Sequence, residues 1–164
     1  MGTEIKILNS TFEISLRFLA ILTVCNYSFS EERLRAYSYY SIHLSDCDST
    51  KNSAHPNIPY RFNNYLGTKE IMHPAIHLLI TKRLIDCIKT SHGIRYSVND
   101  LGKACLSIIC GPYKDKLFEA IQEVDRLLSE KEDEQILIDI SSNLSSWGAE
   151  FKDESLLKDI DDEE

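Results

Sequence analysis

The sequence predicts a mainly α-helical chain with a winged-helix-like domain, in which a β-hairpin wing stands among helices. Two capped apolar segments precede residue 45, two alternating segments flank a Ser-His-Gly turn at residues 91–93, and helical periodicity resumes directly afterwards. A length of 164 residues suits one domain with an extension. We expect the winged-helix-like domain over residues 1–128, a helical extension over 129–151 and an acidic, disordered tail over 152–164.

The first two helices carry recognisable N-terminal signals. Ser10 is a good N-cap for a buried helix over residues 11–25, and Glu13 stands at the spacing of a capping box. Phe12 and Leu16 begin the apolar face of this helix. Ser30 caps a second helix with two acidic residues in its first turn. The inner face of this second helix is predicted to carry Leu34, Tyr37, Ser38 and Ile42.

The middle of the chain alternates breaks and helices. Residues 45–60 hold two prolines and many Asp, Ser and Asn, which predicts a loop. We expect a short helix over residues 62–66 and a separate longer one over residues 68–82, in which Pro74 stands in the first turn or imposes a break.

The hairpin and the later helices follow in order. Strands are expected over residues 84–89 and 95–98, and Asn99 or Asp100 then caps a helix over residues 101–110. An amphipathic helix over residues 114–128 and a last helix over residues 135–151 complete the prediction.

Composition excludes several classes of protein. No apolar run reaches membrane-spanning length, and the first residues lack the pattern of a signal peptide, so we expect a cytoplasmic protein without a membrane partner. The five cysteines form no CxxC pair, and most lie among apolar residues, which argues against a disulfide framework.

Charge is unevenly distributed along the chain. The net charge is −8, of which residues 129–164 contribute thirteen acids and three bases, a net of −10. Residues 68–116 carry eight bases and four acids, a net of +4. The acidic end is either a solvated linker and tail or an electrostatic docking segment. The basic residues in or beside the wing are candidate contacts to DNA phosphates: Lys82, Arg83, Lys89, Arg95 and Lys103.

Base reading by the helix before the wing is not expected. Sequence-specific recognition needs Arg, Asn or Gln on an exposed helix face. Residues 70–83 read EIMHPAIHLLITKR, which is mostly apolar and has no arginine before Arg83. The basic residues therefore suit either a solvated wing face or weak contact with a DNA backbone.

Motifs for catalysis are missing from the sequence. It contains no G-x-S-x-G, no phosphate-binding glycine loop and no GxGxxG, so we expect no catalytic residue and no cofactor. His43, Asp46, Cys47 and His55 include zinc-ligand types, but their spacing matches no standard zinc pattern. We interpret the first two as side chains that hydrogen-bond the loop backbone, and expect no metal.

Several short motifs together resemble a known family. They are LNS at residues 8–10, HLSD at 43–46, HPNIPYR at 55–61, GIRY at 93–96 and PY at 112–113. In this order and spacing they resemble the middle component of bacterial ABC-three-component systems, the small accessory subunit of Lamassu-type anti-phage and anti-plasmid defence. The resemblance covers about residues 8–125.

The resemblance implies a non-enzymatic adaptor subunit. Such a subunit would link an SMC/Rad50-like ATPase that senses DNA to an effector nuclease, and would meet DNA only through the complex. The family motif positions would shape or line a partner interface: His43, Asp46, His55, Pro59 and Arg61. A pair between Arg61 and Asp46 is one hypothesis for the loop. The alternatives are a stand-alone winged-helix DNA-binding regulator and, more remotely, a metal-dependent enzyme that uses the loop histidines.

Overall fold

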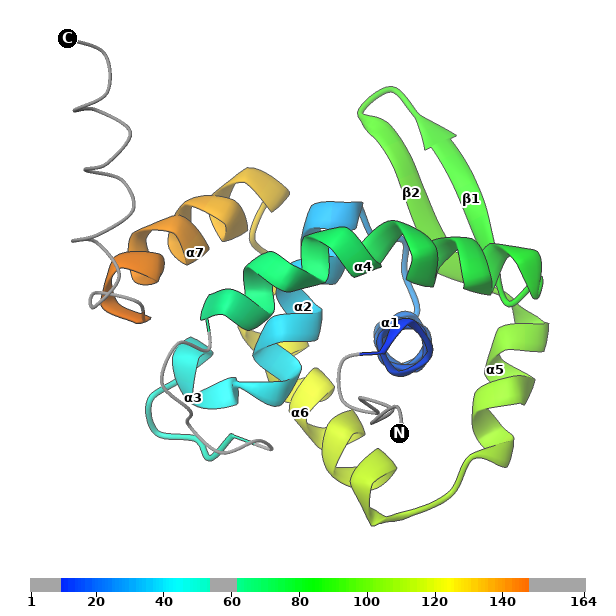
Figure 1. The fold of residues 1–164 in the computed structure, drawn as a ribbon, viewed down its shortest axis with the longest axis horizontal. Helices are drawn as coiled ribbons and strands as arrows, with labels where there is room; N and C mark the ends of the chain where they lie inside the picture. Colours follow the sequence, from blue (N-terminus) through cyan, green and yellow to red (C-terminus); the bar gives the residue numbers. More distant parts are fainter. Residues whose placement is uncertain (1–9, 54–61, 148–164) are drawn as a thin grey trace, which may run out of the picture.

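The computed structural model describes residues 10–53 and 62–147, and it confirms a mainly helical fold with one antiparallel hairpin (Figure 1). The arrangement is consistent with the predicted winged-helix-like class. In chain order the elements are α1 (Thr11–Cys25), α2 (Glu31–Ile42), α3 (Leu44–Cys47), α4 (Phe62–Thr81), β1 (Ile85–Thr90), β2 (Gly93–Val98), α5 (Asp100–Ile108), α6 (Pro112–Leu128) and α7 (Asp133–Trp147).

Helix α1 is the central element of the fold and is viewed end-on in Figure 1. The Ser10 hydroxyl accepts a hydrogen bond from the Glu13 amide, as the predicted cap requires. The helix packs against α2, α4, α5 and α6, and is apolar on almost every side. Its one buried charge, Arg17, forms a close ion pair with Glu13 one turn earlier. The only buried charge in α1 is therefore neutralised by a residue of the same helix.

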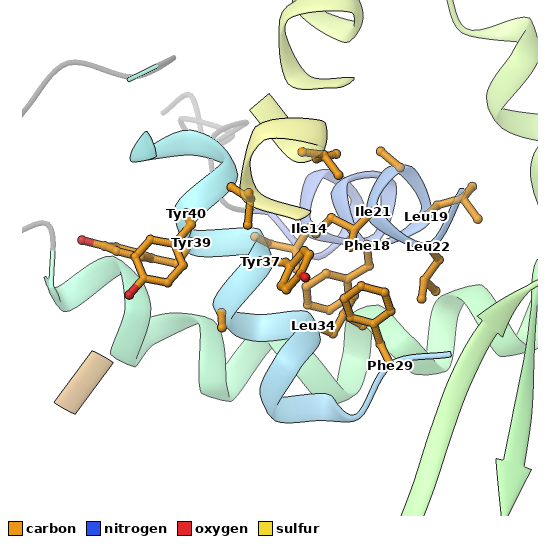
Figure 2. Packing of buried hydrophobic residues seen from close by; sticks show 14 of the residues in the cluster. Ile14, Phe18, Leu19, Ile21, Leu22, Phe29, Leu34, Tyr37, Tyr39 and Tyr40 are labelled. Atoms are coloured by element: carbon orange, nitrogen blue, oxygen red, sulfur yellow. The ribbon is translucent and has the colours of Figure 1, made fainter. Parts of the chain in front are cut away.

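Helix α2 supplies the aromatic half of the core (Figure 2). Ser30 caps it as predicted by accepting from the Arg33 amide. Just before the cap, Phe29 is fully buried and stacks on Tyr27, with ring centroids 4.8 Å apart. The edge of Tyr37 meets the same Phe29 ring at 4.9 Å. All four residues predicted for the inner face of α2 are buried.

The middle of the chain differs from the prediction in two places. A single helical turn, α3 (Leu44–Cys47), overlaps the start of the loop that was expected over residues 45–60. Helix α4 is one continuous helix of 20 residues rather than two, although Pro74 lies inside it. Proline removes one helical hydrogen bond, but it lies on the exposed side of α4. Packing of the opposite side onto α1 and α2 outweighs this loss, through Met72, Ala75, Ile76 and Leu79.

The hairpin is the predicted wing, with both strands starting within two residues of the expected positions. Ile85 pairs with Val98 at its base, and Thr90 pairs with Gly93 at its tip. Phe29 forms an isolated bridge with Tyr96 through two backbone hydrogen bonds of 2.8 and 2.9 Å. The segment between α1 and α2 therefore attaches the wing to the helical core.

The start of α5 packs closely against the base of the wing. Asn99 caps α5 as predicted, accepting from the amide of Gly102. A Cβ atom at Gly102 would stand 2.1 Å from the Leu84 carbonyl oxygen and 3.1 Å from a Leu19 methyl group. Only glycine permits this approach. The helix ends at Ile108, two residues before the predicted end, and Gly111 and Pro112 then start α6.

Helix α7 docks on α2 through a polar joint and an apolar face. It begins at Asp133, two residues before the predicted start, and Arg33 donates from Nε to Asp133 Oδ1 at 2.5 Å. The Ser30 hydroxyl donates to Oδ2 of the same carboxylate at 2.6 Å. Ile136 and Ile140 are fully buried and belong to the same hydrophobic core as α1.

Two further predictions are the boundary between the winged-helix-like domain and its helical extension, and the acidic tail. The division at residues 128 and 129 stays a prediction, and the tail over residues 152–164 lies outside the described residues. Within the described helices, none combines the length and apolar character that crossing a bilayer requires.

The close approach at Gly102 generates the first prediction. Gly102→Ala should lower the free energy of unfolding by about 1–3 kcal/mol, because the new methyl group overlaps a backbone carbonyl that cannot move alone. Gly67→Ala is the matched control, since nothing lies within 4 Å of the added Cβ in α4. It should raise stability by about 0.5–1 kcal/mol. Urea unfolding of both variants checks this, and equal effects would contradict the packing described.

The α7 joint generates a pH prediction. Burial alone would raise the pKa of Asp133, but hydrogen bonds from Ser30 and Arg33 and the charges of Arg33 and Arg95 outweigh it and lower the pKa. The stabilisation is therefore present above the unfolded pKa of about 4 and is lost as pH falls through the folded pKa.

Asp133→Asn should lower the free energy of unfolding at pH 7 by about 1–3 kcal/mol and flatten its fall between pH 5 and pH 3. Hydrogen exchange of the α7 amides at pH 7, combined with urea unfolding across this pH range, measures both effects. Glu134→Gln, on the exposed side of the same helix, serves as the control and should change stability by less than about 0.5 kcal/mol. An Asp133→Asn variant with unchanged α7 exchange would show that the joint does not hold the helix.

Candidate interaction surfaces

Two of the five residues predicted to shape an interface, His43 and Asp46, lie at the junction of α2 and α3. His43 is fully buried there, with its ring 4.9 Å from the ring of Tyr39. Asp46 accepts a 2.6 Å hydrogen bond from the hydroxyl of the same Tyr39. The two motif residues therefore meet on one aromatic side chain, which fixes the turn. His55, Pro59 and Arg61 lie outside the described residues, so the Arg61–Asp46 pair stays a prediction.

A metal centre finds no support in the described part of the chain. Residues 10–53 and 62–147 contain no group of three or more His, Cys, Asp or Glu side chains placed to hold an ion. Burial raises the pKa of the Cys47 thiol to about 11, so this sulfur stays protonated at neutral pH in the free chain. The fourth candidate, His55, is not described.

The five basic candidates for DNA contact fall into two groups. Lys82, Arg83, Lys89 and Lys103 are exposed. Arg95 instead donates to the Ser28 carbonyl at 2.7 Å and to its hydroxyl at 3.2 Å. Its guanidinium also lies 3.6 Å from Asp133. Arg95 thus ties the wing to α7 and to the segment before α2, and the four exposed residues are the better candidates for phosphate contact.

The exposed side of α4 is poorly equipped to read bases. From Tyr65 to Thr81 its exposed residues include Leu66, Lys69 and Glu70, and no arginine, asparagine or glutamine. His73 is exposed on the same helix and lies 3.7 Å from Glu31. This composition agrees with the expectation that the helix does not recognise a DNA sequence.

An apolar groove runs between α1, α4 and α5. Its volume is about 630 Å³, and Lys82 is the one charged residue that lines it within the described ranges 10–53 and 62–147. Phe12 is 64% exposed and Ile108 is 82% exposed at its edges. The described residues that line it are Phe12, Ser15, Leu16, Leu78, Leu79, Lys82, Leu84, Leu101, Ala104, Cys105, Ile108 and Ile109.

A second, smaller hollow of about 110 Å³ continues the groove along α1. Leu16 and Ile109 line both, and the second extends to Tyr113 and Phe118 of α6. Lys114 stands here and donates from Nζ to the carbonyls of Leu106 at 2.9 Å and Ile109 at 2.7 Å. We call the two hollows together the α1–α5 groove.

Sequence reasoning missed the α1–α5 groove. Phe12 was expected on a buried face, but α1 extends at its N-terminal end beyond full coverage by α4 and α5. The available signal was an excess of apolar residues in α5. Gly102 and Leu106 are the residues by which α5 packs against the core. Leu101 and Ile108 remain exposed on the neighbouring side of the helix.

Comparison with known proteins identifies one family. A family model described as ABC-three component (ABC-3C) system Middle Component 2 matches residues 7–150. Neither the curated proteins nor the solved structures yielded a match. The family match covers every described element from α1 to α7 and therefore both parts of the α1–α5 groove. The chain therefore belongs to the Middle Component 2 family of ABC-three component systems, as an accessory subunit of a multi-component system.

Proposed function

We propose that this protein is a non-catalytic adaptor subunit of a Lamassu-like SMC defence complex. In this role it links an SMC/Rad50-like ATPase that senses DNA to an effector nuclease, in immunity against phages or plasmids. The observation that carries the proposal is the α1–α5 groove, whose exposed apolar lining suits contact with another protein.

The chemistry of the groove supports binding rather than catalysis. Among the described residues, the polar side chains that line its larger part are Lys82, the Ser15 hydroxyl and the Cys105 thiol. The Ser15 hydroxyl is engaged with the Thr11 carbonyl at 2.6 Å and the Ala75 carbonyl at 3.2 Å. No histidine or carboxylate of the described residues lines this larger part to act as a base for the Ser15 hydroxyl or the Cys105 thiol. Membership of a multi-component family supplies the reason for a docking surface.

Contact with DNA in this proposal occurs within the assembled complex. The exposed Lys82, Arg83, Lys89 and Lys103 can contact phosphates without reading sequence. The competing function, a stand-alone winged-helix regulator, needs base-reading side chains that α4 does not present between Tyr65 and Thr81.

The purified chain should therefore bind duplex DNA weakly and without sequence preference. We expect a Kd of about 10⁻⁴–10⁻⁶ M at physiological salt, rising steeply with added salt. Fluorescence anisotropy with several unrelated duplexes at a series of salt concentrations measures this. Tight binding that depends on sequence would favour the regulator over the adaptor.

Assembly should depend on the groove. Ile108→Glu should abolish or strongly reduce co-purification with the other components of the system, because a carboxylate would enter an apolar contact. Stability should change by less than about 0.5 kcal/mol, since Ile108 is almost fully exposed in the free chain. Ile138→Glu on α7 is the matched control, because Ile138 is exposed and lies outside the groove. Normal assembly of the Ile108→Glu variant would refute groove-mediated docking.

A further inference from the structure

We propose that the α1–α5 groove receives an amphipathic helix from another component subunit, with an apolar stripe and a carboxylate that pairs with Lys82. This inference rests on the proposed adaptor function and specifies the chemistry of its partner. The groove therefore binds a helix of a different chain.

The shape of the surface suits a helix rather than a small molecule. The two hollows share Leu16 and Ile109 in their linings, so apolar residues line the surface from the end of α4 to the start of α6. A helix presents apolar side chains at positions i, i+3, i+4 and i+7 along one stripe, which matches an elongated groove between helices. Phe12 and Ile108 stand exposed at the edges and would flank the bound helix.

The charges at the groove are positive at both ends. Lys82 lines the α4 end, and its ammonium group makes no hydrogen bond or ion pair with any residue in the ranges 10–53 and 62–147. At the α6 end, Lys114 directs its ammonium group to two carbonyl oxygens, which hold the group in place without neutralising it. Glu13, the one carboxylate among the described residues of the lining, is paired with Arg17. A partner with carboxylates beside its apolar stripe complements this pattern.

Charge reversal tests the pairing directly. Lys82→Glu should weaken binding of the purified chain to its purified partner subunit by about tenfold, because attraction becomes repulsion. The other components encoded with this chain serve as the probe, and biolayer interferometry at two salt concentrations gives the affinity. Lys69→Glu is the matched control: it makes the same charge change at an exposed lysine of α4, outside the groove lining, and should alter affinity by less than about twofold. Circular dichroism confirms that both variants remain folded.

Photo-crosslinking identifies the occupant. A photoreactive residue in place of Ile108 should crosslink to a helical segment of another component that carries Asp or Glu beside apolar residues. Converting that acidic residue to Lys should restore the affinity of the Lys82→Glu variant. A crosslink to a second copy of this chain, or to its own residues 148–164, would overturn the inference.

The outcomes separate the inference from the proposed function. If Ile108→Glu prevents assembly but Lys82→Glu leaves affinity unchanged, the adaptor function stands and the acidic helix is wrong. If neither variant affects assembly, docking in the groove is wrong as well. If both variants weaken binding and the charge exchange restores it, both proposals are supported.

Discussion

The burial of α1 on nearly all sides is the constraint on which the rest of the structure depends. Helices α2, α4, α5 and α6 and strand β2 each pack against it, and α3 and α7 are attached to the fold through α2. Such burial tolerates few polar groups. Arg17 is accommodated because Glu13 pairs with it and the Ser38 hydroxyl lies 3.5 Å from its guanidinium. The core is therefore assembled around an apolar helix that neutralises its own buried charge.

The short segment between α1 and α2 connects the remaining parts. Phe29 bridges to Tyr96 in the wing, while Ser28 and Ser30 accept from Arg95 and donate to Asp133, respectively. On the other side, Tyr27 donates a 2.6 Å hydrogen bond to Asp125 of α6. Burial and this hydrogen bond raise the pKa of Tyr27 to about 12, so it stays a donor at neutral pH. The segment between α1 and α2 is therefore the common attachment point of the wing, α6 and α7.

Interaction surface and core are continuous in this molecule. Leu16 and Ile109 line the α1–α5 groove, while Leu19 and Leu106, close in sequence, belong to the core. A partner bound in the groove would therefore contact the helix that organises the fold. In the proposed adaptor role, the partner would bind to a surface formed by rigid helices rather than by loops.

Much of the local structure was determined by the sequence itself. The caps at Ser10, Ser30 and Asn99 and the turn that joins the two strands of the wing depend on neighbouring residues, and the structure confirms them. Continuity of α4 through Pro74 was decided by tertiary structure, because packing against α1 and α2 outweighs one lost hydrogen bond. The groove and the role of Arg95 were likewise decided there. Both depend on contacts between residues distant in sequence, and periodicity within one helix cannot show which apolar face remains uncovered.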